Sequence, residues 1–278
     1  MEDQEGVALS AGRPEISLRL DTSVPHPARR YNYWLGGKNN FAADRESGDA
    51  IAAAFPTVRT AAAENRRFLR RVVAFLAEQV AIRQFLDIGP GLPSADNTHD
   101  VVRRLDPSSR VVYVDNDPLV TLHSHAFLAG APDAGVTDYV EADVREPNKI
   151  LREAARTLDF SQPVALMLVA ILQFIPDGDD PFGIVGRLID ALPSGSYLVV
   201  SHPSREYVGE KLLADMDSGR HGPFRMRTRE QFARFFDGLD LISPGIVSTA
   251  AWRAENEPQP RPTAAETATY GAVARIVR

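Results

Sequence analysis

The stretch "FLDIGPGLPS", residues 85–94, decides how the rest of the sequence is interpreted. It is an apolar run interrupted by Asp87 and followed by two glycines one residue apart, Gly89 and Gly91. Glycines between a strand and a helix allow the backbone to approach a ligand closely. An ordinary strand-to-helix turn produces the same pattern. The stretch therefore predicts a nucleotide-binding loop only in combination with the pattern of the residues after it.

Short apolar runs alternate with helical patterns after this stretch. The predicted strands are 84–88, 110–115, 136–142, 164–172 and 197–201, and the predicted helices between them are 96–105, 118–128, 148–158 and 181–192. This alternation indicates βαβ units and a parallel sheet, whose functional loops lie at the carboxyl ends of the strands. Two later strands, 239–248 and 270–277, have no helix between them and are expected to pair antiparallel.

Composition excludes several classes of protein. None of the 278 residues is cysteine, which rules out disulfides and thiolate metal sites. The longest apolar run, 164–172, is far shorter than the ~20 residues of a membrane span. The N-terminus lacks an apolar signal region, and a net charge of −6 gives no broad attraction for nucleic acid. We expect a cytoplasmic protein with no metal, nucleic-acid or membrane partner.

Carboxylates close the first three predicted strands. These are Asp87, Asp115 and Asp143. Asp115 follows Gly91 by 24 residues and ends the second strand, where an acid can accept both hydroxyls of an adenosine ribose. Each acid by itself can instead cap a helix. The row of three favours an adenosine site over a set of unrelated turns.

The loop also distinguishes a dinucleotide from other adenosine ligands. Ser94 stands where the G-x-G-x-x-G pattern ends, and Asp96 is a natural N-cap of the next helix. An acid there would occupy the amides and the positive dipole that a pyrophosphate needs. A ligand without phosphate, with a cationic group beside Asp87, fits better. S-adenosylmethionine has a ribose, an ammonium and a sulfonium, and so meets both conditions.

The sequence resembles the class I S-adenosylmethionine-dependent methyltransferases, and more narrowly a bacterial S-adenosyl methyltransferase family of unassigned substrate. The motifs that carry the resemblance span about residues 25–277 and are "YNYWLGGKNNFAADR", "FLDIGPGLPSADNTHD", "RVVYVDNDPLV", "YVEADVREP", "DFSQPVALMLVAILQFIPD", "ALPSGSYLVVSH" and "FFDGLDLISPGIV". The resemblance implies a Rossmann-like, mostly parallel sheet of seven strands with the last strand antiparallel and helices on both faces.

We expect one methyltransferase domain over residues 21–278 after a flexible tail at 1–20. Within it, residues 21–82 form an N-terminal helical extension or lid, and residues 83–278 form the Rossmann-like core. The resemblance places the cofactor's methionine against the first loop, its ribose at the acid of the second strand and its adenine beside the third. The residues expected to bind it are Asp87, Gly89, Gly91, Asp115, Asn116, Asp143, Val144 and Ala170.

Methyl transfer from a sulfonium mainly requires that the acceptor is positioned and water is excluded, and a base is needed only when the acceptor arrives protonated. His202, after the fifth strand, is the candidate general base because histidine titrates near neutral pH. The alternative is a loop histidine bonded to backbone. Gln173, after the fourth strand, is a candidate substrate contact.

The stretch "LGGKNNF", residues 35–41, suggests a lid, because its two glycines permit a sharp reversal of the chain. The residues expected to fold over the cleft are Tyr33, Trp34, Lys38 and Asn39. Tyr33 is a second catalytic candidate, and Tyr33 and Lys38 are expected to contact the acceptor or the cofactor. The alternative is a simple aromatic packing cluster.

The sequence thus predicts an S-adenosylmethionine-dependent methyltransferase that acts on an unidentified, small-molecule acceptor, with a homodimer also considered. Two alternatives remain open. One is a non-catalytic regulatory module that binds S-adenosylmethionine or S-adenosylhomocysteine without turnover. The other, less favoured, is an NAD(P)-dependent oxidoreductase.

Overall fold

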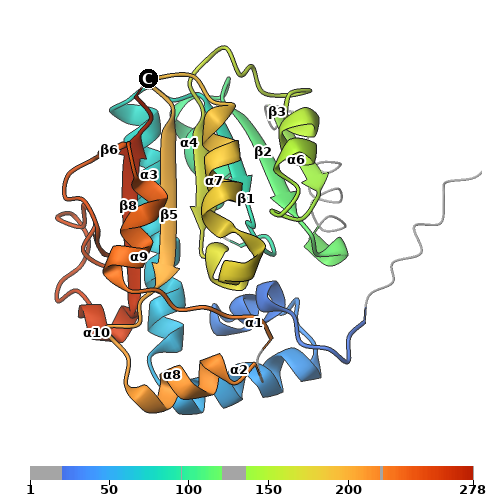
Figure 1. Ribbon diagram of the computed structural model, residues 1–278, viewed down its shortest axis with the longest axis vertical. Coiled ribbons are helices and arrows are strands. Elements are labelled where there is room, and N and C mark those ends of the chain that lie inside the picture. The colour runs from blue at the N-terminus through green and yellow to red at the C-terminus, as the bar shows by residue number, and fades with distance from the viewer. Residues whose placement is uncertain (1–20, 95, 121–135, 220–221, 278) are drawn as a thin grey trace, which may run out of the picture.

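The computed structural model describes residues 21–94, 96–120, 136–219 and 222–277. One mixed sheet runs through the molecule with helices on both faces (Figure 1). Its strands are β1 (Gln84–Ile88), β2 (Arg110–Asp115), β3 (Val136–Glu141), β4 (Ala165–Val169), β5 (Tyr197–Pro203), β6 (Asp240–Leu241), β7 (Val247–Ser248) and β8 (Thr269–Arg275). The helices and 3₁₀ turns are α1 (Pro27–Trp34), α2 (Ala42–Ala54), α3 (Val58–Glu78), α4 (Thr98–Leu105), α6 (Pro147–Ala154), η1 (Leu172–Phe174), η2 (Asp177–Asp179), α7 (Pro181–Asp190), α8 (Glu210–Asp217), α9 (Arg229–Ala233), η3 (Arg234–Phe236) and α10 (Ala264–Thr267).

The strand order is β3-β2-β1-β4-β5-β8-β6, and β7 also pairs with β8. The first five strands are parallel and β8 is antiparallel to β5, which confirms the predicted fold class. The predicted strand at 239–248 is two short strands, so the sheet has eight strands, and not seven, in the part of the chain that the structure describes. Between these two short strands, Pro244 and Gly245 turn the chain away from β8. The φ of Gly245 is 80°.

Both faces of the sheet are buried because successive strand residues point to opposite sides. Phe85 packs with α3 and α4, and its neighbour Leu86 packs with α6 and α7 on the other face. Figure 1 shows this layering, with α6, α7 and α9 in front of the sheet and α3 and α4 behind it. The near-continuous apolar runs of the sequence are those of strands covered on both sides.

Helix α3 is fastened to the carboxy-terminal part of the chain by arginines. Arg71 donates through Nε to the Trp252 carbonyl at 2.8 Å and lies 3.2 Å from the Glu257 carboxylate. Nearer the start of the helix, the buried Glu64 accepts from Arg261. These contacts fix α3 against the carboxy-terminal part of the chain, and α3 carries Asn65 one residue after Glu64.

Helices α1, α2 and α8 lie across the carboxyl ends of the parallel strands, at the bottom of Figure 1. Ile51 of α2 and Val58 of α3 form an apolar cluster with Leu212, Met216 and Met226. This cluster ties the N-terminal helices to the segment that follows β5. The predicted tail at 1–20, and the predicted helix 118–128 beyond Val120, lie outside the described residues.

Gly271 of β8 is expected to tolerate no side chain, because a Cβ there would lie 2.8 Å from the ring of Phe68. We predict that Gly271→Ala lowers the free energy of unfolding by about 1–3 kcal/mol through overpacking. Gly186→Ala, in helix α7 where a Cβ would meet nothing within 4 Å, is the matched control and should stabilise the protein slightly. Urea denaturation measures both. Equal effects of the two substitutions would contradict the prediction.

Candidate functional site

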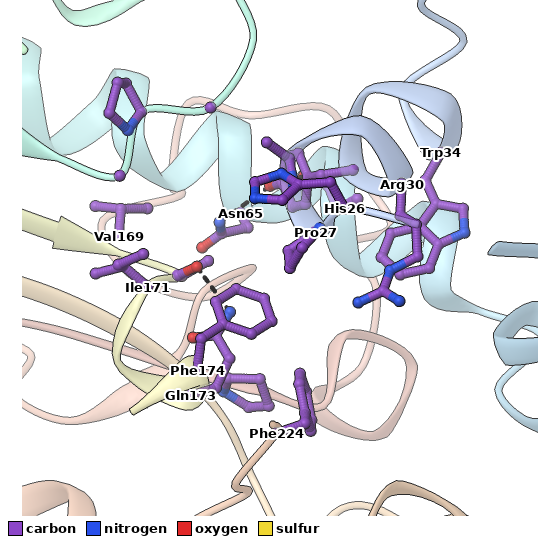
Figure 2. A pocket seen from close by; sticks show the side chains of 18 of the residues that line it. His26, Pro27, Arg30, Trp34, Asn65, Val169, Ile171, Gln173, Phe174 and Phe224 are labelled. Atoms are coloured by element: carbon purple, nitrogen blue, oxygen red, sulfur yellow. Dashed lines mark hydrogen bonds between the residues drawn. The ribbon is translucent and has the colours of Figure 1, made fainter. Parts of the chain in front are cut away.

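A cavity of about 520 Å³ lies at the carboxyl ends of β1, β2 and β4, between these strand ends and helices α1 and α3. It has two parts. One part, called the nucleotide end below because it carries the residues predicted to bind the cofactor, is lined by Asp87, Gly89, Gly91, Asp115, Asn116, Asp143 and Val144. The inner chamber is lined by Trp34, Phe55, Phe174, Leu212, Met216, Phe224 and Met226. Figure 2 shows the walls of this cavity, with α1 residues facing those that follow β4.

The loop after β1 can be built only with glycine. Gly89 and Gly91 have φ values of 75° and 69°, in the left-handed region that other residues rarely adopt. At Gly89 a Cβ would also lie 2.7 Å from the side chain of Ile171. The backbone of the loop therefore forms one wall of the cavity directly, and Ile171 packs against it.

The three acids predicted from the strand ends come together at the cavity. Asp115 accepts hydrogen bonds from the backbone N–H of Gly91 at 3.1 Å and of Asp117 at 2.9 Å, while burial raises its pKa. Asn116 donates to Asp143 at 2.9 Å. Burial would raise the pKa of Asp143, but hydrogen bonds from Arg145 and Asn116 lower it. Both carboxylates are therefore held in fixed positions.

Asp87 is the most deeply buried of the three acids, with 2% of its surface exposed. Its Oδ2 accepts from the hydroxyl of Thr98 at 2.6 Å. Burial raises the pKa of Asp87 to about 6. A buried carboxylate of this kind is stabilised by a cationic group brought beside it. This is the property expected of a residue that faces an ammonium or sulfonium.

The predicted N-cap of the next helix is wrong by one residue. Asn97, not Asp96, is the N-cap of α4. Asp96 has a φ of 58° and contacts Arg104 at 2.8 Å, outside the helix. Asp100 accepts from the Asn97 N–H at 3.0 Å, so a carboxylate of the chain still occupies the start of this helix.

The segment after β4 enters the cavity through a strained residue. Ala170 has a φ of 56°, which is uncommon for a residue with a side chain. Its N–H donates to the Ser201 carbonyl at 3.2 Å and its own carbonyl accepts from Gln173 Nε2 at 2.7 Å. Ala170, which was predicted to bind the cofactor, and Gln173, which was predicted to contact the substrate, both line the cavity.

The structure does not place His202 where a general base would act. Its side chain is fully buried, and Arg227 Nη1 lies 2.7 Å from its Nε2. Its Nδ1–H donates to the Pro203 carbonyl at 2.9 Å. Burial and the adjacent guanidinium lower the pKa of His202 to about 3. His202 is a neutral structural histidine here, because both ring nitrogens are occupied by the chain itself.

Of the four residues predicted to form a lid, only Trp34 lines the cavity. Trp34 lines the inner chamber and donates to the Gly48 carbonyl at 3.1 Å. Tyr33, one position earlier, points elsewhere and bonds to Asp49 at 2.8 Å. Lys38 and Asn39 are exposed on the turn after α1. The predicted catalytic or contact roles of Tyr33, Lys38 and Asn39 therefore have no support in this geometry, since neighbouring helix residues face different sides.

Several polar residues at the cavity were missed in the sequence, among them His26 and Asn65. His26 caps α1, and its Nδ1 lies 3.1 Å from the buried Asp117 carboxylate. Asn65 of α3 lines the cavity with 4% of its surface exposed. Asn65 precedes Phe68 and Leu69 on the same face of α3. A polar residue that continues an apolar stripe was therefore the sequence signal that could have identified Asn65 as a buried site residue.

Across the residues that the structure describes, no group of three or more histidine or acidic side chains is arranged to hold a metal ion. Among the helices described, none has the length and apolar character needed to cross a bilayer.

Comparisons with known proteins show which family of proteins the chain is similar to. A family model described as "S-adenosyl methyltransferase" matches residues 14–277. The crystal structure of a DUF574 family protein from Streptomyces avermitilis is 43% identical, with a TM-score of 0.85 over 92% of this chain and 99% of that one. A candidate methyltransferase from Thermobifida fusca is 38% identical, with a TM-score of 0.85 over 95% of this chain and 99% of that one. No protein with a curated description matches the chain.

The buried His202 is expected to make stability depend on pH. Between pH 6.5 and about 3 the unfolded histidine binds a proton that the folded one does not, so stability falls as pH decreases. We predict that wild type loses about 2 kcal/mol more than His202→Gln between pH 7 and pH 5. Urea denaturation at both pH values measures the difference. Parallel losses in the two proteins would show that His202 is protonated in the fold.

Proposed function

The chain belongs to the S-adenosyl methyltransferase family and uses S-adenosylmethionine, and on this premise we propose that it methylates a small-molecule acceptor held in the inner chamber. When bound, S-adenosylmethionine supplies a methyl group on a positively charged sulfur. The observation that carries the proposal is a continuous cavity, whose carboxylate-lined nucleotide end leads into an apolar chamber.

We assign the cofactor contacts to the nucleotide end. Asp115, held by two backbone donors, is suited to accept the ribose hydroxyls. Asp143 is assigned to the adenine amino group, with Val144 beside the ring. Asp87 is assigned to the cationic methionine end, because a buried carboxylate gains most from a nearby positive charge. Asn116 supports this set through its bond to Asp143.

The acceptor is proposed to be small and largely apolar. Most residues of the inner chamber are aromatic or aliphatic, and Phe174 packs edge-on against Phe224 with ring centroids 5.8 Å apart. The whole cavity is within the range of about 300–1,000 Å³ that is typical of sites for small ligands. Walls of this kind exclude water from the reacting atoms.

We further propose that residues 21–82 act as the cover of the active site. Helices α1 and α2 and the start of α3 close the cavity on the side away from the sheet. In this proposal the cover positions the acceptor and keeps solvent out, and residues 83–278 bind the cofactor. Positioning supplies most of the catalysis, so no histidine base is assigned.

The function is tested by incubating the protein with S-adenosylmethionine labelled on the methyl carbon and three acceptor pools: small apolar alcohols and amines, an unrelated protein and nucleic acid. We expect label only in the small-molecule pool. Label that accumulates only in the protein or nucleic-acid pool would contradict a small-molecule acceptor.

Asp115→Ala is expected to weaken S-adenosylhomocysteine binding roughly ten- to a hundredfold, because it removes charge-assisted hydrogen bonds worth about 1.5–3 kcal/mol. Isothermal titration calorimetry measures the dissociation constant. Glu141→Gln, which neutralises an exposed acid paired in register with Asp115, is the control and should leave it unchanged. Equal affinity of Asp115→Ala and wild type would remove Asp115 from the site.

Asp87 is expected to make cofactor binding depend on pH. Below about pH 6 its carboxyl group is protonated and attracts a cation less strongly. We predict that S-adenosylhomocysteine affinity rises as pH increases from 5 to 7, by up to about tenfold for each unit below pH 6. Asp87→Asn should bind weakly with no such rise. Titrations across this range, in buffers of different ionisation enthalpy, measure affinity and proton release together.

A further inference from the structure

Two amide oxygens buried at the cavity have no hydrogen-bond partner among the described residues. They are Oδ1 of Asn65 and Oε1 of Gln173. Both residues line the cavity, and their exposed fractions are 4% and 5%. Asn65 comes from α3 and Gln173 from η1, so two distant parts of the chain bring them to one site. Figure 2 shows Asn65 turned toward Ile171 and Gln173.

The orientation of each amide is determined by its neighbours. Gln173 Nε2 lies 2.7 Å from the Ala170 carbonyl, which can only accept, so the nitrogen must face it. The Tyr31 hydroxyl donates its single proton to the Ala62 carbonyl at 2.9 Å. It can therefore only accept from Asn65, whose Nδ2 lies 3.0 Å away. Both amides consequently leave an oxygen, and not a nitrogen, unpaired.

Unpaired buried acceptors are costly, at about 1–3 kcal/mol each, and few persist in folded proteins. In this chain two of them lie at one cavity. A bound ligand that donates hydrogen bonds would recover this free energy. The ligand must carry N–H or O–H groups at this point, because an amide oxygen cannot donate.

The two amides flank the place where the cofactor and acceptor regions meet. Ile171 lies beside them in Figure 2 and also packs against Gly89 of the nucleotide end. Gln173 is followed directly by Phe174 of the inner chamber, and its carbonyl accepts from Arg225 N at 2.7 Å, next to Phe224. A donor bound here is therefore at the border of the apolar chamber.

We propose that Asn65 and Gln173 bind the O–H or N–H of the acceptor, which makes the substrate an apolar alcohol, phenol or amine methylated on that oxygen or nitrogen. This inference rests on the proposed function and specifies its substrate class. On methylation, the acceptor atom forms a bond to the methyl carbon while the carbon–sulfur bond breaks with its electron pair kept by sulfur. The methylated product releases the acceptor's proton to bulk water when it leaves the cavity.

The test compares 2-naphthol with 2-methylnaphthalene, which has a methyl group in place of the hydroxyl. Equilibrium dialysis against protein saturated with S-adenosylhomocysteine measures both dissociation constants. We expect wild type to prefer 2-naphthol by at least about tenfold, as one or two hydrogen bonds predict. Asn65→Leu and Gln173→Met, close in shape but without the amide oxygen, should reduce the preference below about threefold. Their S-adenosylhomocysteine affinity should stay within about threefold of wild type.

Two results would overturn the proposal. One is the absence of a preference for 2-naphthol in wild type, including no binding of either compound. The other is a preference that survives in both variants while their S-adenosylhomocysteine affinity falls more than about tenfold, which would assign the two oxygens to the cofactor's ammonium. Failure of wild type to bind S-adenosylhomocysteine at all would instead contradict the proposed function. Thermal unfolding verifies that both variants fold.

Discussion

The close contact between the loop after β1 and Ile171 is the constraint on which the site depends. Gly89 lies against Ile171 so tightly that a Cβ would approach it to 2.7 Å, and its left-handed φ excludes most other residues. This contact joins the edge of β1 to the segment after β4. Because β1 and β4 are adjacent parallel strands, their loops open at the same edge of the sheet. The two loops form one wall of the cavity, and α1 forms part of the opposite wall.

The buried guanidinium of Arg227 holds the segment after β4 in place. Arg227 donates to the carbonyls of Leu172 and Ile175, each at 3.0 Å, and to the carboxylate of Asp177 at 2.9 Å. His202 accepts a fourth bond, which explains why this histidine is neutral and inaccessible. A buried charge is tolerated only when its donors are satisfied. The cluster therefore stabilises the turn that carries Gln173, and His202 contributes to positioning and not to proton transfer.

The polar groups of the cavity oppose the stability of the fold. Asp87 and Asp115 have pKa values raised by burial, and Asn65 and Gln173 keep unpaired oxygens. Each of these features costs free energy in the protein without ligand. These four residues occur together at one cavity. Such a distribution is expected where the requirements of ligand binding, and not those of folding stability, determine which residue type occupies a position.

The sequence by itself determined the sheet, because apolar runs and glycines are local signals. The strands at 84–88 and 110–115 have the bounds that were predicted, and the acids that end the first three strands meet at one cavity, since parallel strands share a carboxyl edge. The prediction of one continuous strand at 239–248 was wrong, because Pro244 and Gly245 turn the chain between two short strands.

Only the tertiary structure decided which side chains reach the cavity from outside the sheet. Tyr33 and Trp34 are adjacent in sequence and both contact α2, but only Trp34 lines the cavity. Asn65 reaches the cavity through the packing of α3. His202 was predicted to follow the fifth strand, but it lies within β5, where Arg227, 25 residues later, contacts its ring. Contacts between distant segments set the burial and orientation of these side chains, and the local pattern of the sequence indicates them only in part.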